Sequence, residues 1–196
     1  MNIAIFGGGF SPPTLGHLHV AKSVLDTCDI DYVDILPSYH HRFKSGMIDF
    51  EHRMRMCELN FDDLGMKTVE IEKLAYEAGS DGSTRFLAEF VSELSKSSDS
   101  IYRDCQFSFV IGVDNADTIA TWKDPEWLLS NVNFIVIPRG GYSPKLDWYR
   151  KENHTFLDVE AVEFSSTQAR EGFRNGDFSM MKDEVVDYMH KYNVDI

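Results

Sequence analysis

The sequence lacks the features of a membrane or secreted protein. It has no apolar run of about 18 residues, the length that a membrane-spanning helix needs. Its first residues carry no basic leader and run directly into a glycine turn, so we expect a core strand there and no secretion signal. Cysteines are few: Cys28, Cys57 and Cys105 are odd in number and fit no zinc spacing. We therefore expect reduced, structural thiols and a cytoplasmic protein.

Positive charge is also scarce. The chain has 19 Lys and Arg residues against 32 Asp and Glu, and its formal net charge is −13. A surface this acidic repels nucleic acids and anionic membranes, so we expect neither as a partner. If the substrates are anions, the few cations must gather in one local pocket. The cations beside glycine turns and helix starts are therefore the best candidates for residues that bind an anionic substrate.

Short strand-like and longer helix-like apolar patterns alternate over the 196 residues. This alternation predicts an α/β fold: a Rossmann-like, doubly wound and mostly parallel sheet with helices on both faces. In such a sheet, ligands bind beyond the carboxyl ends of the strands, where the strand order reverses. We expect one domain over residues 1–196, with C-terminal helices from about residue 165 packed on it. The expected strands are 2–6, 33–36, 68–71, 106–113, 133–137 and 155–162, and the expected helices are 16–27, 49–64, 83–94, 125–130, 165–174 and 183–192.

A first phosphate-shaped motif follows the first expected strand and reads Gly7-Gly8-Gly9-Phe10-Ser11-Pro12-Pro13-Thr14-Leu15-Gly16-His17. The three glycines let the backbone turn tightly and let a phosphate approach the main chain. A helix that begins near Gly16 offers its free N–H groups at the same place, and His17 in its first turn can donate a hydrogen bond to phosphate. Pro12 excludes a G-x-G-x-x-G dinucleotide fingerprint, and the missing G-K-[ST] excludes a Walker A loop. For His17 taken alone, a surface histidine after a glycine turn stays an alternative.

A second motif, Ser165-Ser166-Thr167-Gln168-Ala169-Arg170, stands at the start of an expected helix. Ser166 and Arg170 are four residues apart and so share one helix face. Hydroxyl groups, free amides and a planar guanidinium suit a terminal phosphate, because the guanidinium can pair two oxygens at once. The alternative is an ordinary serine cap with a solvated arginine. Because both motifs are present, we expect them to converge as the two sides of a nucleotide triphosphate site.

Both motifs resemble those of the nucleotidyltransferase superfamily, Gly-x-Phe-x-Pro with [His/Thr]-x-x-His early and Ser-Ser-Thr-x-x-Arg late. Thr14 stands where many members carry histidine. The segments 36–44, 50–56, 111–115, 121–122 and 134–142 are similar to the nicotinate or nicotinamide mononucleotide adenylyltransferases, so the resemblance covers nearly the whole chain in order. In 79–84, the Ser-Tyr-Thr segment of acid-preferring members is missing and Asp81 is present. The choice between the acid and the amide substrate therefore stays open.

The resemblance implies adenylyl transfer from ATP to nicotinate or nicotinamide mononucleotide, which gives the dinucleotide of NAD biosynthesis and pyrophosphate. We expect Mg²⁺ to bridge the ATP phosphates, and because no carboxylate cluster has a metal spacing, we expect substrate and water to hold the ion. The expected catalytic residues are His17, Lys44 and Arg170. The expected ATP-binding residues are Gly8, Gly9, Phe10, Thr14, Gly16, His17, Gly112, Asp114, Ser166, Thr167 and Arg170. The expected mononucleotide-binding residues are Ser11, Lys44, Ser83, Thr84, Trp122 and Arg139.

Some of these residues have plainer interpretations: Lys44 as a solvated surface lysine, Asp114 as a helix cap and Trp122 as a core residue. Two other functions also stay open. One is adenylyl transfer to another phosphorylated acceptor such as phosphopantetheine, against which Trp122 and the extent of the resemblance argue. The other is a catalytically inactive, ATP-binding regulator, which Thr14 and the segment around Asp81 favour. The sequence leaves the oligomeric state open, a homo-oligomer included.

Overall fold

The computed structural model describes residues 1–39, 46–62, 66–140, 145–150, 153–157, 159 and 165–195 of the chain. Its strands are β1 (Asn2–Gly8), β2 (Tyr32–Pro37), β3 (Lys67–Thr68), β4 (Gln106–Gly112), β5 (Asn133–Ile137) and β6 (Thr155–Phe156). They form one six-stranded parallel sheet in the order β3-β2-β1-β4-β5-β6. The order reverses between β1 and β4, which confirms the expected doubly wound sheet.

The central strand β1 fixes where the strand ends meet. Gly8 lies opposite Pro37 of β2, and Phe6 lies opposite Val110 of β4. Ala4 in the middle of β1 has no exposed surface, because helices cover both faces of a parallel sheet. The carboxyl ends of β1, β2 and β4 therefore come together at one edge of the sheet.

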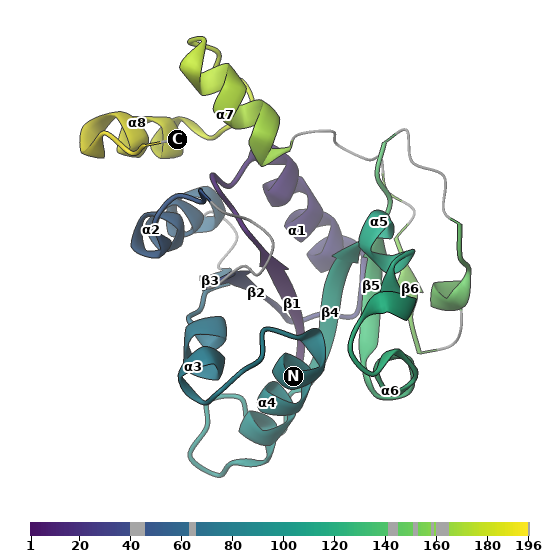
Figure 1. Cartoon of the computed structure of the whole chain (residues 1–196). Helices are drawn as coiled ribbons and strands as arrows, with labels where there is room; N and C mark the ends of the chain where they lie inside the picture. The colour runs from purple at the N-terminus through teal and green to yellow at the C-terminus, as the bar shows by residue number, and fades with distance from the viewer. Residues whose placement is uncertain are drawn as a thin grey trace.

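Helices lie on both faces of the sheet (Figure 1). On one face, α1 (Leu15–Thr27) and α2 (Phe50–Phe61) share a buried cluster with β1 and β2. On the other face, α4 (Thr84–Lys96) and α6 (Pro125–Asn131) pack over β4 and β5. Within the described residues, none of the helices combines the length and apolarity that crossing a bilayer requires. The other helical segments are α3 (Ile71–Glu77), α5 (Val113–Ala116), η2 (Ile119–Thr121), η3 (Trp148–Arg150), α7 (Ser166–Arg174) and α8 (Asp183–Tyr192).

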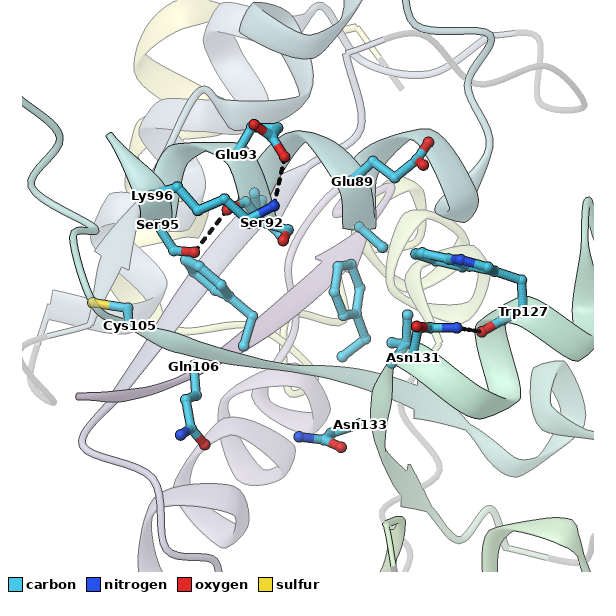
Figure 2. A pocket seen from close by; sticks show the side chains of 15 residues that line it. Glu89, Ser92, Glu93, Ser95, Lys96, Cys105, Gln106, Trp127, Asn131 and Asn133 are labelled. Atoms are coloured by element: carbon cyan, nitrogen blue, oxygen red, sulfur yellow. Dashed lines mark hydrogen bonds and ion pairs between the residues drawn. The ribbon is translucent and has the colours of Figure 1, made fainter. Parts of the chain in front are cut away.

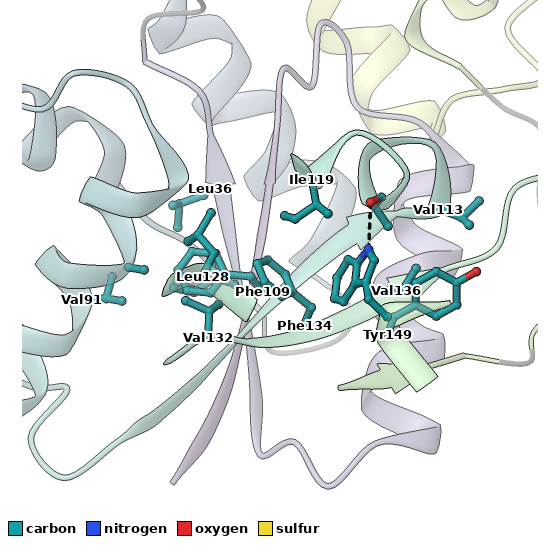
Figure 3. Packing of buried hydrophobic residues seen from close by; sticks show 14 of the residues in the cluster. Leu36, Val91, Phe109, Val113, Ile119, Leu128, Val132, Phe134, Val136 and Tyr149 are labelled. Atoms are coloured by element: carbon teal, nitrogen blue, oxygen red, sulfur yellow. Dashed lines mark hydrogen bonds between the residues drawn. The ribbon is translucent and has the colours of Figure 1, made fainter. Parts of the chain in front are cut away.

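Aromatic packing around Phe134 of β5 builds the core on the α4–α6 face (Figure 3). Phe134 is 1% exposed, and its ring centroid lies 6.5 Å from that of Phe109 and 5.5 Å from that of Trp148. The indole N–H of Trp148 donates to the Ala116 carbonyl at 3.0 Å. This contact fastens η3 to the end of α5, and so keeps α5 at the carboxyl end of β4.

The two C-terminal helices pack on α2. A third buried cluster joins Met56 of α2 to Ala169 of α7 and Met189 of α8. The Leu15 amide at the start of α1 also donates to the Met180 carbonyl, which lies between α7 and α8, at 2.9 Å. Figure 1 shows the result: α7 stands beside the start of α1, far along the sequence from it.

Two expected elements differ from those observed. The expected strand 68–71 is wrong beyond Thr68, because Ile71 begins α3, a helix that the sequence analysis does not predict. Ile71 and Ala75 are both buried, and a four-residue spacing places them on one helix face. Within the expected strand 155–162, the structure has a strand at Thr155–Phe156, and residues 158 and 160–162 lie outside the described residues.

Candidate active site

A cleft of about 980 Å³ lies at the carboxyl ends of β1, β4 and β5. Strand order reverses between β1 and β4, and that reversal is the usual place for a ligand in such sheets. The glycine turn with Gly8 and Gly9 lines the cleft, as do Gly112 at the end of β4 and the first residues of α7. Both phosphate-shaped motifs therefore face one cleft.

Direct hydrogen bonds join the two motifs. The Ser166 hydroxyl donates to the Pro12 carbonyl at 2.8 Å, across 154 residues of sequence. One terminal nitrogen of Arg170 donates to the Ser11 carbonyl at 2.6 Å, and the other donates to the Thr167 hydroxyl at 3.3 Å. These contacts exclude the alternative of a solvated arginine. The expectation that the two motifs converge is confirmed.

His17 is held by the residue that caps its own helix. The backbone N–H of Thr14 donates to Nδ1 of His17 at 3.0 Å, and the Thr14 hydroxyl lies 2.8 Å from the same nitrogen. Because Nδ1 accepts from the backbone, the neutral ring carries its proton on Nε2, where it is a donor. The ring packs edge-on against Phe10, with centroids 5.0 Å apart, and His17 lines the cleft. His17 therefore brings a hydrogen-bond donor to this cleft.

Thr14 lies at the start of α1. Its side chain has no exposed surface and accepts from the His17 backbone N–H at 3.4 Å as the N-cap of α1. Thr14 is not among the described residues that line the cleft. The other expected ATP-binding residues all line it: Gly8, Gly9, Phe10, Gly16, His17, Gly112, Asp114, Ser166, Thr167 and Arg170.

The cleft gathers cations in a chain whose net charge is −13. Arg139 and Arg170 both line it. Asp114 is the only carboxylate among the described lining residues, and it pairs with Arg139 at 2.5 Å. Gly112 makes room for this carboxylate, since a Cβ at that position would lie 2.6 Å from Oδ1 of Asp114. With two helix starts added, the potential at the cleft suits an anionic ligand.

Three of the expected mononucleotide-binding residues form a group of their own. Ser83 caps α4, which Thr84 begins, and its hydroxyl donates to Asp81 at 2.5 Å. Lys123, next to Trp122, donates to the same carboxylate at 2.5 Å. Hydrogen bonds from Lys123 and Ser83 hold the pKa of Asp81 well below its usual value. Ser83, Thr84 and Trp122 are not among the described lining residues of the cleft, and the Asp81–Lys123 ion pair joins them to one another.

The remaining expected residues divide in two. Ser11 and Arg139 line the cleft, whereas Lys44 lies outside the described residues, so its role stays a prediction. Ser165 and Gln168 belong to the second motif but are not among the expected binding residues, and both line the cleft as well. The backbone N–H of Gln168 donates to the Ser165 hydroxyl at 3.2 Å, and the backbone N–H of Ser165 donates to the side-chain oxygen of Gln168 at 3.1 Å. These two hydrogen bonds form a capping box. The spacing of serine and glutamine in the sequence is the signal that predicts such a box.

A second cavity of about 580 Å³ lies between α4, β4 and the end of α6 (Figure 2). In the described part of its lining, the charged groups are Glu89, Glu93 and Lys96. The ammonium of Lys96 is already bound to Glu93 at 2.7 Å. Two carboxylates beside one paired ammonium repel a polyphosphate. We therefore place the candidate active site at the larger cleft.

Comparison with known proteins agrees with this geometry. Residues 5–172 match the cytidylyltransferase-like family, a range that contains both phosphate-shaped motifs. The chain belongs to the cytidylyltransferase-like family. A relative from Bacillus cytotoxicus, named probable nicotinate-nucleotide adenylyltransferase, is 30% identical over 88% of this chain and 86% of its own length. A relative of the same name from Desulfotalea psychrophila is 30% identical over 98% of each chain. These members of the family confirm the resemblance to the nicotinate or nicotinamide mononucleotide adenylyltransferases.

The fold is similar to that of the Plasmodium falciparum nicotinic acid mononucleotide adenylyltransferase, solved in complex with NaAD. The TM-score is 0.77 at 23% identity, and the match covers 98% of this chain and 96% of that chain. This likeness confirms the α/β architecture expected of the family.

The capping contact of Thr14 leads to a prediction about stability. We expect Thr14→Val to lower the free energy of unfolding by about 0.5–2 kcal/mol, because α1 loses its N-cap hydroxyl while the side-chain shape is kept. Thr14→Ser keeps the hydroxyl and should lose less. Urea unfolding of the three proteins measures the differences. Equal stability of the valine and serine variants would contradict the capping role.

Proposed function

We propose that this chain transfers the adenylyl group of ATP to the 5′-phosphate of nicotinate mononucleotide, which forms the dinucleotide of NAD biosynthesis and pyrophosphate. The observation that carries the proposal is the direct bonding of the two phosphate-shaped motifs at one cleft, Arg170 to Ser11 and Ser166 to Pro12. Membership of the family and the names of the relatives support the same reaction and the nicotinate substrate.

In the proposed reaction, a phosphate oxygen of the mononucleotide attacks the α-phosphorus of ATP. The bond from that phosphorus to the pyrophosphate oxygen breaks in line. No protein nucleophile is required, so the chain acts by aligning the reactants and by stabilising the charge that grows on the phosphate oxygens. His17 donates from Nε2 to the reacting phosphates. Lys44, outside the described residues, is assigned to the attacking phosphate.

The start of α7 is assigned to the leaving pyrophosphate. Ser166 and Thr167 stand in its first turn, where unpaired amides carry partial positive charge. The guanidinium of Arg170 has five N–H groups. Its bonds to Ser11 and Thr167 therefore leave further donors for phosphate oxygens. The same bonds hold the guanidinium in place before substrate binds, which supports its assignment.

A divalent ion accompanies ATP in such transfers, and we propose Mg²⁺. In the described part of the chain, no cluster of three or more His, Cys, Asp or Glu side chains offers a metal cage. Mg²⁺ usually keeps several water ligands and binds to substrate phosphates. We therefore propose that the ion arrives on the ATP phosphates. Asp114 is assigned to a ribose hydroxyl of ATP, and Ser11 and Arg139 are assigned to the mononucleotide.

Ser83, Thr84 and Trp122 are assigned to the pyridine ring. An unpaired Asp81 carboxylate would repel the carboxylate of nicotinate at this place. Lys123 and the Ser83 hydroxyl both donate to Asp81 at 2.5 Å, so its negative charge is largely balanced. This compensation removes the electrostatic objection to the acid substrate.

The proposed enzyme works in the cytoplasm, where its three free cysteines stay reduced. Its substrates are nucleotides, and the acidic net charge of −13 argues against nucleic acid or membrane partners. A single domain over residues 1–196 stays a prediction.

The role of His17 is open to direct test. We expect His17→Ala to fold and to lower kcat by at least about 10²-fold, the scale on which enzymes lose one transition-state donor. His19→Ala is the matched control, because His19 lies on the same helix and is not among the described lining residues. Pyrophosphate release from ATP and nicotinate mononucleotide measures both variants. Near-normal turnover by His17→Ala would remove His17 from the mechanism.

The choice of acceptor tests the proposed function itself. We expect pyrophosphate release to be faster with nicotinate mononucleotide than with nicotinamide mononucleotide, and absent with phosphopantetheine. Lys123→Ala should lower the acid-to-amide rate ratio by about five- to tenfold, because the uncovered charge of Asp81 repels the nicotinate carboxylate. Adding Asp81→Asn to that variant should restore the ratio.

Other outcomes would redirect the assignment. Release with phosphopantetheine alone would mean a different acceptor. ATP binding without release on any acceptor would favour an inactive regulator. An unchanged ratio in Lys123→Ala would contradict the placing of the pyridine ring near Trp122.

A further inference from the structure

The segment 50–56, to which the proposed function gives no role, contains a buried cation. Arg53 of α2 is only 2% exposed and is not among the described residues that line the cleft. Its Nε donates to the Ile48 carbonyl at 2.7 Å, and its Nη1 donates to the Gly9 carbonyl at 3.0 Å. A buried charge is costly unless it is paired and hydrogen-bonded. Here one of the bonds that satisfy it ends on the glycine turn.

Glu72 of α3 lies near enough to act on this charge, without a direct ion pair between the two side chains. It attracts the guanidinium of Arg53, and its carboxylate accepts from the Tyr39 amide at 3.0 Å. The adjacent Ser38 amide donates to the Gly8 carbonyl at 2.9 Å. Arg53 thus binds Gly9 of the turn directly. Glu72 is connected to Gly8 indirectly, through Tyr39 and Ser38, which follow β2.

The turn that they reach contains a strained residue. Phe10 has a φ of +42°, a left-handed conformation that side-chain-bearing residues rarely adopt and that persists only where the surroundings fix it. Arg53 binds the carbonyl of Gly9, just before Phe10. Just after it, the Ser11 hydroxyl accepts from the Ile48 amide at 3.0 Å, and Arg53 binds the carbonyl of that same Ile48. One guanidinium therefore fixes the chain on both sides of Phe10.

We infer that Arg53 is a positioning residue for adenylyl transfer, with Glu72 as a partly buried charge that acts on its guanidinium. Arg53 holds the glycine turn in the conformation that receives the phosphates of ATP. The Phe10 ring packs against the His17 ring, so a shift of Phe10 also shifts the imidazole that donates to the reacting phosphates. This inference rests on the proposed function and adds to it two residues that do not touch substrate.

Glu72 makes the arrangement sensitive to pH. Burial raises its pKa to about 7, against smaller lowering effects of the Tyr39 amide, Arg53 and Ser38. As the pH falls through about 7, the carboxylate takes up a proton and loses its attraction for Arg53. Among the described residues, the other titratable groups near the pair include Tyr39 after β2, Asp49, Glu51 and Cys57 on or next to α2, and Glu70, Lys73 and Tyr76 on or next to α3, with Lys73 paired to Glu51 and Glu70.

The first test removes the guanidinium. We expect Arg53→Met to lower kcat by about 10²-fold, the scale of loss from a small misplacement of reacting groups. The KM for ATP should change less, because the buried cluster that joins Ala169 of α7 to Met56 of α2 does not include Arg53. Arg53→Lys retains the charge but not the two-armed geometry, so it should recover part of kcat. Arg55→Met is the matched control, since Arg55 is an exposed arginine of the same helix that pairs with Glu58.

The second test removes the titration. Glu72→Gln keeps an acceptor for the Tyr39 amide but cannot ionise. We expect the wild-type kcat/KM to fall as the pH drops below about 7, the pKa of Glu72. In Glu72→Gln this fall should move toward about pH 6, where the mononucleotide phosphate itself titrates. Identical pH profiles for the two proteins would contradict a role for Glu72.

These outcomes separate the inference from the function on which it rests. Wild-type protein that releases no pyrophosphate with any pyridine mononucleotide overturns the proposed function. An active wild type, with Arg53→Met and Glu72→Gln indistinguishable from it, overturns the inference alone. If circular dichroism shows that Arg53→Met does not fold, Arg53→Lys and Glu72→Gln decide the question in the same assays.

Discussion

The hydrogen bond of 2.6 Å from Arg170 to the Ser11 carbonyl is the contact on which the candidate site depends. It joins a helix near the C-terminal end of the chain to the turn after the first strand. Packing supports this contact from behind, because α7 and α8 rest on Met56 of α2. Arg53 of α2 also donates to the Gly9 carbonyl of the glycine turn. Both sides of the cleft therefore rest on α2, and a movement of that helix would displace them together.

The acidity of the chain does not conflict with an anionic substrate. Backbone N–H groups at the starts of α1 and α7 add positive potential at the cleft, and they contribute nothing to the formal charge of −13. Arg170 adds a full charge, and Asp114 balances much of that on Arg139. Because the rest of the surface repels anions, a polyphosphate finds the cleft favourable through local geometry and not through the overall field.

How much the sequence predicts depends on whether the signal is local. The strands β1, β4 and β5 are predicted because buried parallel strands form continuous apolar runs, and the cleft is predicted because glycine turns and helix starts have their own signatures. The helix α3 is not predicted, since its 7 residues bury only Ile71 and Ala75, and short apolar runs distinguish poorly between strand and helix. The placement of Arg53 and Glu72 escapes prediction as well. It depends on bonds to Gly9 and Tyr39, which lie 44 and 33 residues away in sequence.

The contacts of Thr14 differ from those that the resemblance implies. The resemblance assigns it to ATP, yet its hydroxyl caps α1 and its N–H holds Nδ1 of His17. To reach a phosphate, the side chain would have to leave the cap and open the first turn of the helix. In the proposed reaction, which has no protein nucleophile, the rate depends on where donors stand when charge develops. In that reaction, residues that place those donors, Thr14 for His17 and Arg53 for the glycine turn, would affect the rate although they do not touch the phosphates.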